Sequence, residues 1–168
     1  MKKLAFVVFL FLVLAASGLS AQASLMLADS DNKQAVKQLA EWLNGRGTPV
    51  TISDSGNYLL YKDYDEDLII ALYPKMSKLG LDRILAYAYF NGLDQSEGQG
   101  KLYELANKLN TAWNIGTFFI DDDGSLGAES QITFVDYIDY VEIKNFLRWF
   151  DAAVVEATSE DWLDDYLE

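Results

Sequence analysis

The sequence of 168 residues contains neither histidine nor cysteine. Without an imidazole or a thiol, the chain cannot form a Ser-His-Asp or Cys-His catalytic arrangement. Zinc, haem and iron–sulfur sites that depend on His or Cys ligands are excluded for the same reason. Disulfide bonds are excluded as well, so the hydrophobic core must hold the fold. These absences remove most enzyme chemistries and leave a pair of carboxylates as the one general catalytic option. Our prediction is a non-enzymatic protein with no catalytic residues, no metal site and no cofactor.

Basic residues are also scarce, with 13 Lys and Arg against 26 Asp and Glu and a formal net charge of -13. This excess of acid repels phosphate backbones, so we expect no binding to nucleic acid. Hydrophobic residues nevertheless make up 51% of the chain and aromatic residues 14%. That composition is too apolar for a disordered acidic polymer and indicates a compact folded domain.

The longest apolar run lies at the N-terminus. Two lysines precede 13 consecutive apolar residues from Leu4 to Ala16, and Ala21-Gln22-Ala23 has a small-x-small pattern. This arrangement is typical of a cleaved signal peptide, and the run is shorter than the ~20 apolar residues that a membrane-spanning helix needs. We predict a signal peptide over residues 1–23 with cleavage after Ala23. The mature protein is then periplasmic or secreted, with no stable membrane insertion.

Three segments have apolar residues at the helical spacing of three and four. The first begins near Asp31 or Asn32 and ends at Gly45, the second follows the glycine-rich segment Gly92–Gly100, and the third runs from about Tyr140 to Ala157. The expected core positions of the last two helices are Leu102, Leu105, Ala106 and Leu109, then Ile143, Phe146, Leu147, Phe150 and Val154.

The remaining apolar segments predict strands. They are Val50 to Ile52, Tyr58 to Tyr61, Asp67 to Tyr73, Ile84 to Phe90, Gly116 to Ile120 and Gln131 to Val135. Asp121–Gly124 is expected to reverse the chain between the last two strands, and Pro74–Arg83 to form a loop. The order α-β-β-β-β-α-β-β-α predicts an α+β fold, an antiparallel sheet with helices packed on one face. The domain spans residues 24–158, followed by an acidic aromatic tail over residues 159–168. No convincing internal repeat is found.

Two stretches, Leu102–Asn110 and Gly116–Leu126, together with the amphipathic last helix, resemble the YbjN family of bacterial proteins. That family is usually described as sensory-transduction regulators, and its fold is similar to that of type III secretion chaperones. The resemblance implies a non-enzymatic protein-binding, chaperone-like or regulatory module. It also implies a protein partner or a homodimer, because sheets of this shape commonly dimerise.

The chain has more aromatic residues than one core stripe requires, and some are candidates for contact with a partner. These possible partner-binding residues are Tyr87, Tyr89, Trp113, Trp149, Trp162 and Tyr166. The tail from Ser159 to Glu168 could form a short helix that binds a partner, or it could fold back on its own domain, which we favour.

Two other functions stay open. One is a small-ligand sensor with a pocket between sheet and helices. The other is a carboxylate-dependent hydrolase, for which Glu104, Glu129, Asp136 and Glu142 lie beside apolar residues. The acidic clusters at Asp63–Asp67 and Asp121–Gly124 do not match the ligand spacing of an EF-hand, and we interpret both as turns.

Overall fold

The computed structural model describes residues 23–27, 31–62, 68–79, 81–90, 99–159, 163 and 166. The elements of this described part are β1 (Ser24–Met26), α2 (Asn32–Asn44), β2 (Val50–Ile52), β3 (Leu59–Lys62), β4 (Ile69–Lys75), β5 (Asp82–Phe90), α3 (Gln99–Ala112), β6 (Thr117–Ile120), β7 (Leu126–Phe134), β8 (Tyr137–Asp139) and α4 (Tyr140–Ala157). Within these ranges no helix is both long and apolar enough to cross a membrane. The predicted signal peptide lies outside the described residues, except for Ala23.

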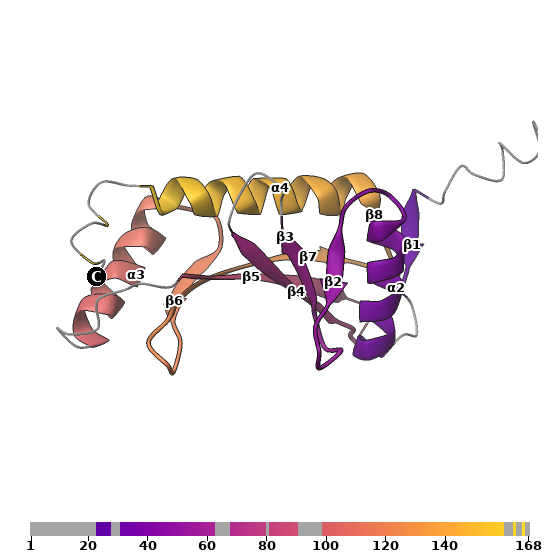
Figure 1. Ribbon diagram of the computed structural model, residues 1–168, viewed down its shortest axis with the longest axis horizontal. Coiled ribbons are helices and arrows are strands. Elements are labelled where there is room, and N and C mark those ends of the chain that lie inside the picture. The colour runs from indigo at the N-terminus through magenta and orange to yellow at the C-terminus, as the bar shows by residue number, and fades with distance from the viewer. Residues whose placement is uncertain are drawn as a thin grey trace, which may run out of the picture.

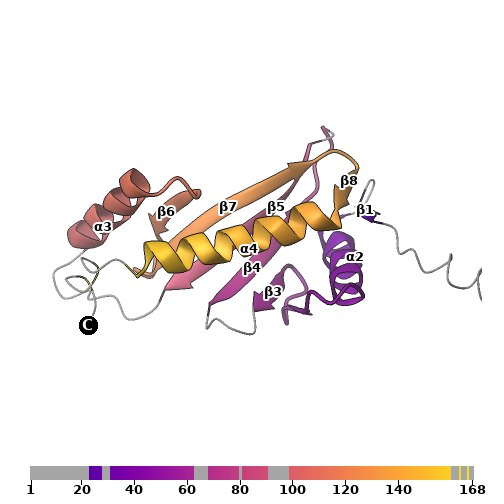
Figure 2. The ribbon, with the colours of Figure 1, turned by 90° about the horizontal axis from the view of Figure 1, so that it is seen from above.

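The predicted α+β class is confirmed. Six strands form an antiparallel sheet in the order β2-β3-β4-β5-β7-β6, and β1 and β8 form a separate antiparallel pair. Helix α4 runs along one face of the large sheet, while α2 and α3 lie at its two ends (Figure 1; from above, Figure 2). The order of helices and large-sheet strands agrees with the prediction. The likeness to type III secretion chaperones stays a prediction.

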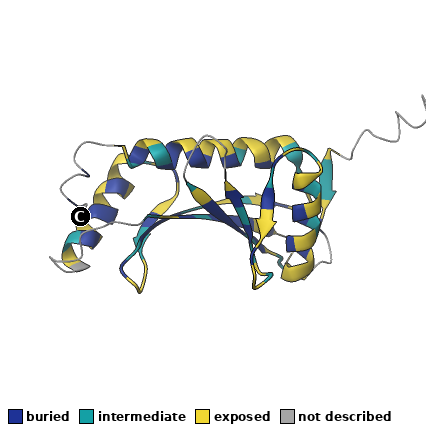
Figure 3. Cartoon of the chain, viewed as in Figure 1, coloured by how far each residue is buried: buried dark blue, intermediate teal, exposed yellow. Residues whose placement is uncertain are grey.

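Helix α4 has the bounds that the periodicity predicts. Its N-cap is Asp139, whose Oδ1 accepts a hydrogen bond from the Val141 N–H at 2.7 Å, and this bond satisfies a helix N–H that has no partner within the helix. Four of the five expected core residues are buried, and Phe146 is half-buried. Figure 3 shows the buried positions of α4 on the side that faces the sheet.

The predicted bounds of β4, β5 and β7 are wrong. The predicted loop at Pro74–Arg83 is shorter than expected, because β4 continues to Lys75 and β5 begins at Asp82. Pro74 is tolerated there, since β3 begins at Leu59, opposite Leu72, and leaves Pro74 with a paired strand on one side only. Strand β7 begins at Leu126 instead of Gln131, because pairing with all of β5 extends it through residues of low strand propensity.

The pair β1–β8 was not expected from the sequence. Met26 lies opposite Tyr137, and the Leu27 N–H donates to the Asp136 carbonyl at 2.9 Å. Asp136 has a φ of 60°, a conformation that Asp tolerates better than most residues, and it separates β7 from β8. The strand pair fixes the chain beside the start of α4 and buries Leu27 in the core.

Two asparagines close parts of the outer sheet edges. Asn44 of α2 donates from Nδ2 to the Val50 carbonyl at 3.0 Å and accepts from the Val50 N–H at 2.9 Å. Asn110 of α3 makes the same two bonds with Phe118, each at 2.8 Å. Val50 and Phe118 lie in the outer strands β2 and β6. Unpaired backbone groups on an edge invite another strand, so the asparagines reduce the surface open to strand addition.

The hydrogen bonds of Asn44 with Val50 and of Asn110 with Phe118, which we call the asparagine clamps, share a local sequence. Leu39–Asn44 of α2 and Leu105–Asn110 of α3 both have the pattern Leu-Ala-x-x-Leu-Asn. In both helices the leucines and the alanine are buried, and the asparagine pairs with the nearer edge strand. The structure thus reveals a short repeat that sequence inspection did not find, because six residues become convincing only when both copies make the same contacts.

Replacing Asn110 by Ala should lower the free energy of unfolding by about 1–2 kcal/mol, because two partly buried backbone groups of Phe118 lose their partner. Urea melts measure the change. Asn107→Ala, at an exposed position of the same helix, is the matched control and should change stability by less than about 0.5 kcal/mol. Equal losses in the two variants would show that the clamp contributes no stability.

Two described residues of the tail, Leu163 and Tyr166, are packed against the domain. Leu163 is 4% exposed and Tyr166 is 7% exposed, and both belong to the hydrophobic core. The ammonium groups of Lys101 and Lys108 in α3 lie 5.4 Å and 6.0 Å from the centre of the Tyr166 ring. These two tail residues have the folded-back arrangement that we favour from the sequence.

Candidate binding face of the sheet

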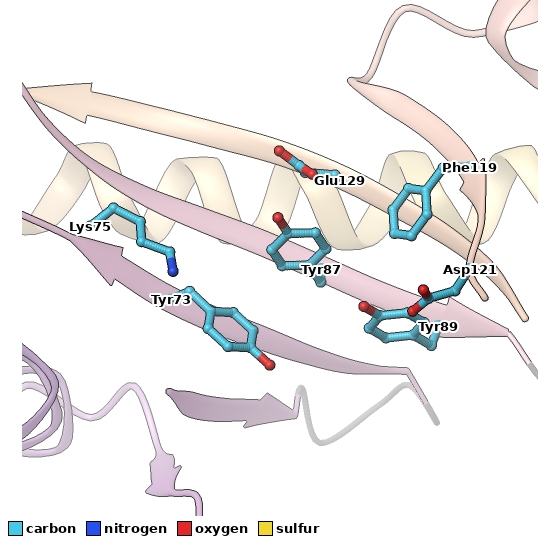
Figure 4. A pocket seen from close by; sticks show the side chains of 7 residues that line it. All are labelled: Tyr73, Lys75, Tyr87, Tyr89, Phe119, Asp121 and Glu129. Atoms are coloured by element: carbon cyan, nitrogen blue, oxygen red, sulfur yellow. The ribbon is translucent and has the colours of Figure 1, made fainter. Parts of the chain in front are cut away.

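The large sheet has an open face on the side away from α4. Side chains alternate between the two faces of a strand, so Ile84, Ala86 and Ala88 of β5 are buried in the core while Tyr87 and Tyr89 lie on the opposite face. That face carries a hollow of about 390 Å³ (Figure 4). Its lining residues come from β4, β5, β7, β6 and the turn after β6: Tyr73, Lys75, Tyr87, Tyr89, Phe119, Asp121 and Glu129.

Five aromatic rings form a continuous row across this face, and we call them the aromatic ladder: Tyr58, Tyr73, Tyr87, Tyr89 and Phe119. Tyr58 stacks on Tyr73 at 4.7 Å between ring centres, and Tyr73 meets the edge of Tyr87 at 5.4 Å. Phe119 lies at right angles to both Tyr87 and Tyr89, at 6.2 Å and 6.1 Å. These are favourable geometries for aromatic pairs, so the rings support one another on the sheet.

Strand register explains why Phe119 reaches the ladder. Gly127 of β7 lies between Phe119 of β6 and Tyr89 of β5 in the paired strands. A Cβ atom on Gly127 would come within 2.4 Å of the end of the Phe119 ring, so a side chain at this position would displace the ring from its place over β7. Because Gly127 has no side chain, the rings of Phe119 and Tyr89 can contact each other across β7.

The electrostatics of the hollow act on its tyrosines. Burial raises the pKa of Tyr73, and burial together with a hydrogen bond to Glu129 raises the pKa of Tyr87 to about 12. Burial also raises the pKa of Tyr89, as do the negative charges of Asp121, Asp123 and Glu129. Burial and the negative groups therefore disfavour the phenolate form of these tyrosines, and the Tyr87 hydroxyl donates a hydrogen bond to the Glu129 carboxylate.

The pKa of Tyr87 predicts a loss of stability at alkaline pH. Tyrosines of the unfolded chain lose their protons near pH 10.0, whereas Tyr87 of the folded protein keeps its proton until about pH 12. The free energy of unfolding should therefore fall as the pH rises through this interval. Tyr87→Phe should reduce the fall, as measured by urea melts at several pH values. The same slope in both proteins would contradict the prediction.

The structure brings two of the six predicted partner-binding residues together. Tyr87 and Tyr89 share the hollow. Trp149 is 46% exposed on α4, and Trp113 is half-buried against the core after α3. Tyr166 is buried in this conformation, and Trp162 lies outside the described residues. Contact of any of the six with a partner stays a prediction.

Sequence reasoning missed three members of the ladder, namely Tyr58, Tyr73 and Phe119. Alternation within the predicted strands could have indicated that Tyr73 and Phe119 point away from the core. It could not have indicated that they lie beside Tyr87, because neighbouring strands are brought into register by pairs such as Ala71 with Tyr87 and Glu129 with Tyr87.

The hollow also bears on the two alternative functions. It lies on the face opposite α4 and not between sheet and helices, where we expected a sensor pocket. Of the four candidate hydrolase carboxylates, Glu129 lines the hollow, and it shares that lining with Asp121. The other three, Glu104, Asp136 and Glu142, are exposed elsewhere.

The acidic reversal at Asp121–Gly124 is a hairpin turn, as predicted. The carboxylate of Asp123 accepts a hydrogen bond from the Ser125 N–H at 2.9 Å, and this bond lowers the pKa of Asp123. Among the described residues no group of three or more carboxylates is placed to hold a metal ion. The second acidic cluster, residues 63–67, lies outside the described part.

Comparison with known proteins gives one family. Residues 35–160 match the family model YbjN, whose description is "putative bacterial sensory transduction regulator". The matched region includes every strand and helix from β2 to α4, and therefore all five rings of the ladder. No curated protein matches the sequence.

Proposed function

The chain belongs to the YbjN family, and we propose that it is an exported regulator that acts by binding another polypeptide across the open face of its sheet. The observation that carries this proposal is the aromatic ladder. Tyrosine and phenylalanine supply much of the contact energy in protein interfaces, and Tyr combines an apolar ring with a hydrogen-bonding group. Tyr89 is 44% exposed, so a partner can reach the ladder without unfolding the domain.

The sheet edges favour the face over strand addition as the mode of binding. A peptide that adds to an edge needs free backbone groups on the outer strand. Asn44 and Asn110 occupy such groups at Val50 and Phe118. The open face has no helix packed on it in the described part of the chain (Figures 1 and 4). A partner that contacts this face would cover rings instead of extending the sheet.

Site-specific photocrosslinking tests this proposal. Photoreactive benzoylphenylalanine at Phe119 should give a crosslinked product in living cells, and the product should be lost when Tyr89→Ala is added. The same amino acid at Trp149, an exposed aromatic position on α4 and itself a partner-binding candidate from the sequence, tests the helical face, and it should give none if the partner binds the open face. A product from Trp149 and none from Phe119 would move the binding surface to the helical face. A product of twice the monomer mass would identify a homodimer as the partner.

Export is the second part of the proposal, and it rests on the apolar run from Leu4 to Ala16 and the small residues at Ala21 and Ala23. Cleavage after Ala23 would keep all residues of the described elements, because β1 begins at Ser24, and would remove only the Ala23 carbonyl that accepts a hydrogen bond from the Tyr140 N–H at 2.9 Å. N-terminal sequencing of the protein purified from its native host should therefore begin at Ser24. A sequence that begins at Met1 would contradict export by signal-peptide cleavage.

A small-ligand sensor is the second candidate. The hollow of about 390 Å³ falls within the range of small-molecule sites, and polar groups at its rim could orient a ligand. Polypeptide binding is favoured because the ladder continues beyond the hollow to Tyr58, so the aromatic surface is wider than a small ligand needs.

A further inference from the structure

Most charges of the open face are separated along the strands, apart from Lys62 of β3, which lies on this face opposite Ile69, level with Tyr89 and two strands away. Lys75 and Arg83 are paired across β4 and β5 at one end, whereas Asp121 lies at the other end beside Tyr89, and Glu129 lies near Tyr87 (Figure 4). Lys75 is the one cation among the lining residues of the hollow, against two carboxylates. The end with Tyr89 and Phe119 is therefore both aromatic and negative.

The carboxylates at this end lie close enough to act on Tyr89. Burial raises the pKa of Tyr89, and the charges of Asp121, Asp123 and Glu129 raise it further. The negative potential therefore extends to a ring that is partly exposed to solvent. A cation that approaches Tyr89 from solvent meets an aromatic ring and attractive charges at once.

The molecule already contains one example of a cation on the ladder. The Lys75 ammonium lies 5.7 Å from the centre of the Tyr73 ring, within the distance at which the ring attracts a cation. The rings of Tyr89 and Phe119 offer the same kind of surface, with carboxylates in place of a resident cation. The excess of negative charge on the whole chain, -13, also favours encounters with basic partners.

We infer that the end of the hollow formed by Tyr87, Tyr89, Phe119, Asp121 and Glu129 binds an arginine side chain of the partner polypeptide. Arginine suits the site because its planar guanidinium can stack on an aromatic ring while its N–H groups donate to carboxylates. The basic end at Lys75 and Arg83 disfavours a second cation beside the first. The inference rests on the proposed function, since it names the partner group that the open face recognises.

A titration of the isotope-labelled protein with two short peptides, followed by nuclear magnetic resonance, tests the inference. One peptide of Gly and Ser carries a single Arg, and the other has Gln in its place. The Arg peptide should shift the signals of Tyr87, Tyr89 and Phe119 and should bind about tenfold more tightly than the Gln peptide, a ratio that corresponds to about 1.4 kcal/mol. High salt should weaken the binding of the Arg peptide.

Charge variants locate the site. Asp121→Asn combined with Glu129→Gln should weaken binding of the Arg peptide about fivefold or more, because the guanidinium loses both carboxylates. Glu156→Gln removes one exposed carboxylate from α4 and should leave the affinity unchanged. Lys75→Gln should increase the affinity, because it removes the cation from the hollow. An increase of this kind is not expected if the charges serve only the stability of the fold.

The outcomes separate this inference from the proposed function. Equal binding of the two peptides on the open face, or no binding of either while Phe119 still crosslinks to a partner, would overturn the arginine site and leave polypeptide binding in place. Failure of both the titration and the crosslinking would remove the proposed function as well.

Discussion

Replacing Phe150 by Ala is expected to lower the free energy of unfolding by about 3–5 kcal/mol. The Phe150 side chain is 0% exposed and lies on the face of α4 that packs on the sheet. Its ring also stacks on Phe146, with 6.2 Å between ring centres, so truncation removes buried contacts and leaves a cavity. Urea unfolding, followed by circular dichroism, measures the loss.

Its chain neighbour provides the control. Trp149 is 46% exposed, so Trp149→Ala should cost less than about 1 kcal/mol although a larger side chain is removed. The difference between the two variants depends on which side of α4 faces the sheet. If Trp149→Ala were the more damaging change, the helix would face the other way.

Replacing Gly116 by Ala should lower the free energy of unfolding by about 2–5 kcal/mol, because two effects combine. Gly116 has a φ of 150°, a conformation that residues with side chains rarely adopt. A Cβ atom there would also come within 1.9 Å of the Glu129 carbonyl oxygen. The backbone of β6 or β7 must therefore move, and urea melts should show the loss.

The effect of Gly116→Ala should extend to the binding face, because β6 carries Phe119 and β7 carries Glu129. The Gly116→Ala variant should lose peptide binding as well as stability. Gly100→Ala is the matched control, since nothing lies within 4 Å of its added Cβ and Gly100 is in helix α3. This second change should be neutral or stabilising by up to about 1 kcal/mol. Equal destabilisation by both changes would show that the close approach at Gly116 is not the cause.

Local chemistry predicts the helices well. The spacing of Ile143, Leu147 and Phe150 and the cap at Asp139 depend on residues within a few positions of one another, and they give α4 its observed bounds. The hairpin from β2 to β3 is equally local, because Gly56 has the positive φ that its turn requires. For such elements the residues that decide the structure are close together in the sequence.

The length of strand β7 and the composition of the candidate site depend on contacts between segments that are distant in the sequence. Strand β7 is longer than its own residues indicate because it pairs with β5 from Phe90↔Leu126 to Asp82↔Phe134. The candidate site has the same origin, since its rings come from strands whose register is set by those pairs. Tyr87 and Tyr89 could be placed on one face because they share a strand, whereas Phe119 and Glu129 could not be placed beside them.

The asparagine clamps also bear on how the chain folds. Asn44 and Val50 are 6 residues apart, and Asn110 and Phe118 are 8 residues apart, so each helix can capture its outer strand at a small cost in loop closure. The central pairing of β5 with β7 joins residues 36 to 52 positions apart, from Phe90 with Leu126 to Asp82 with Phe134. Contacts of that separation slow folding. We therefore expect the units α2–β2 and α3–β6 to form early and the pairing of β5 with β7 to limit the folding rate. The outer strands would then already be partly covered before the central strands have paired.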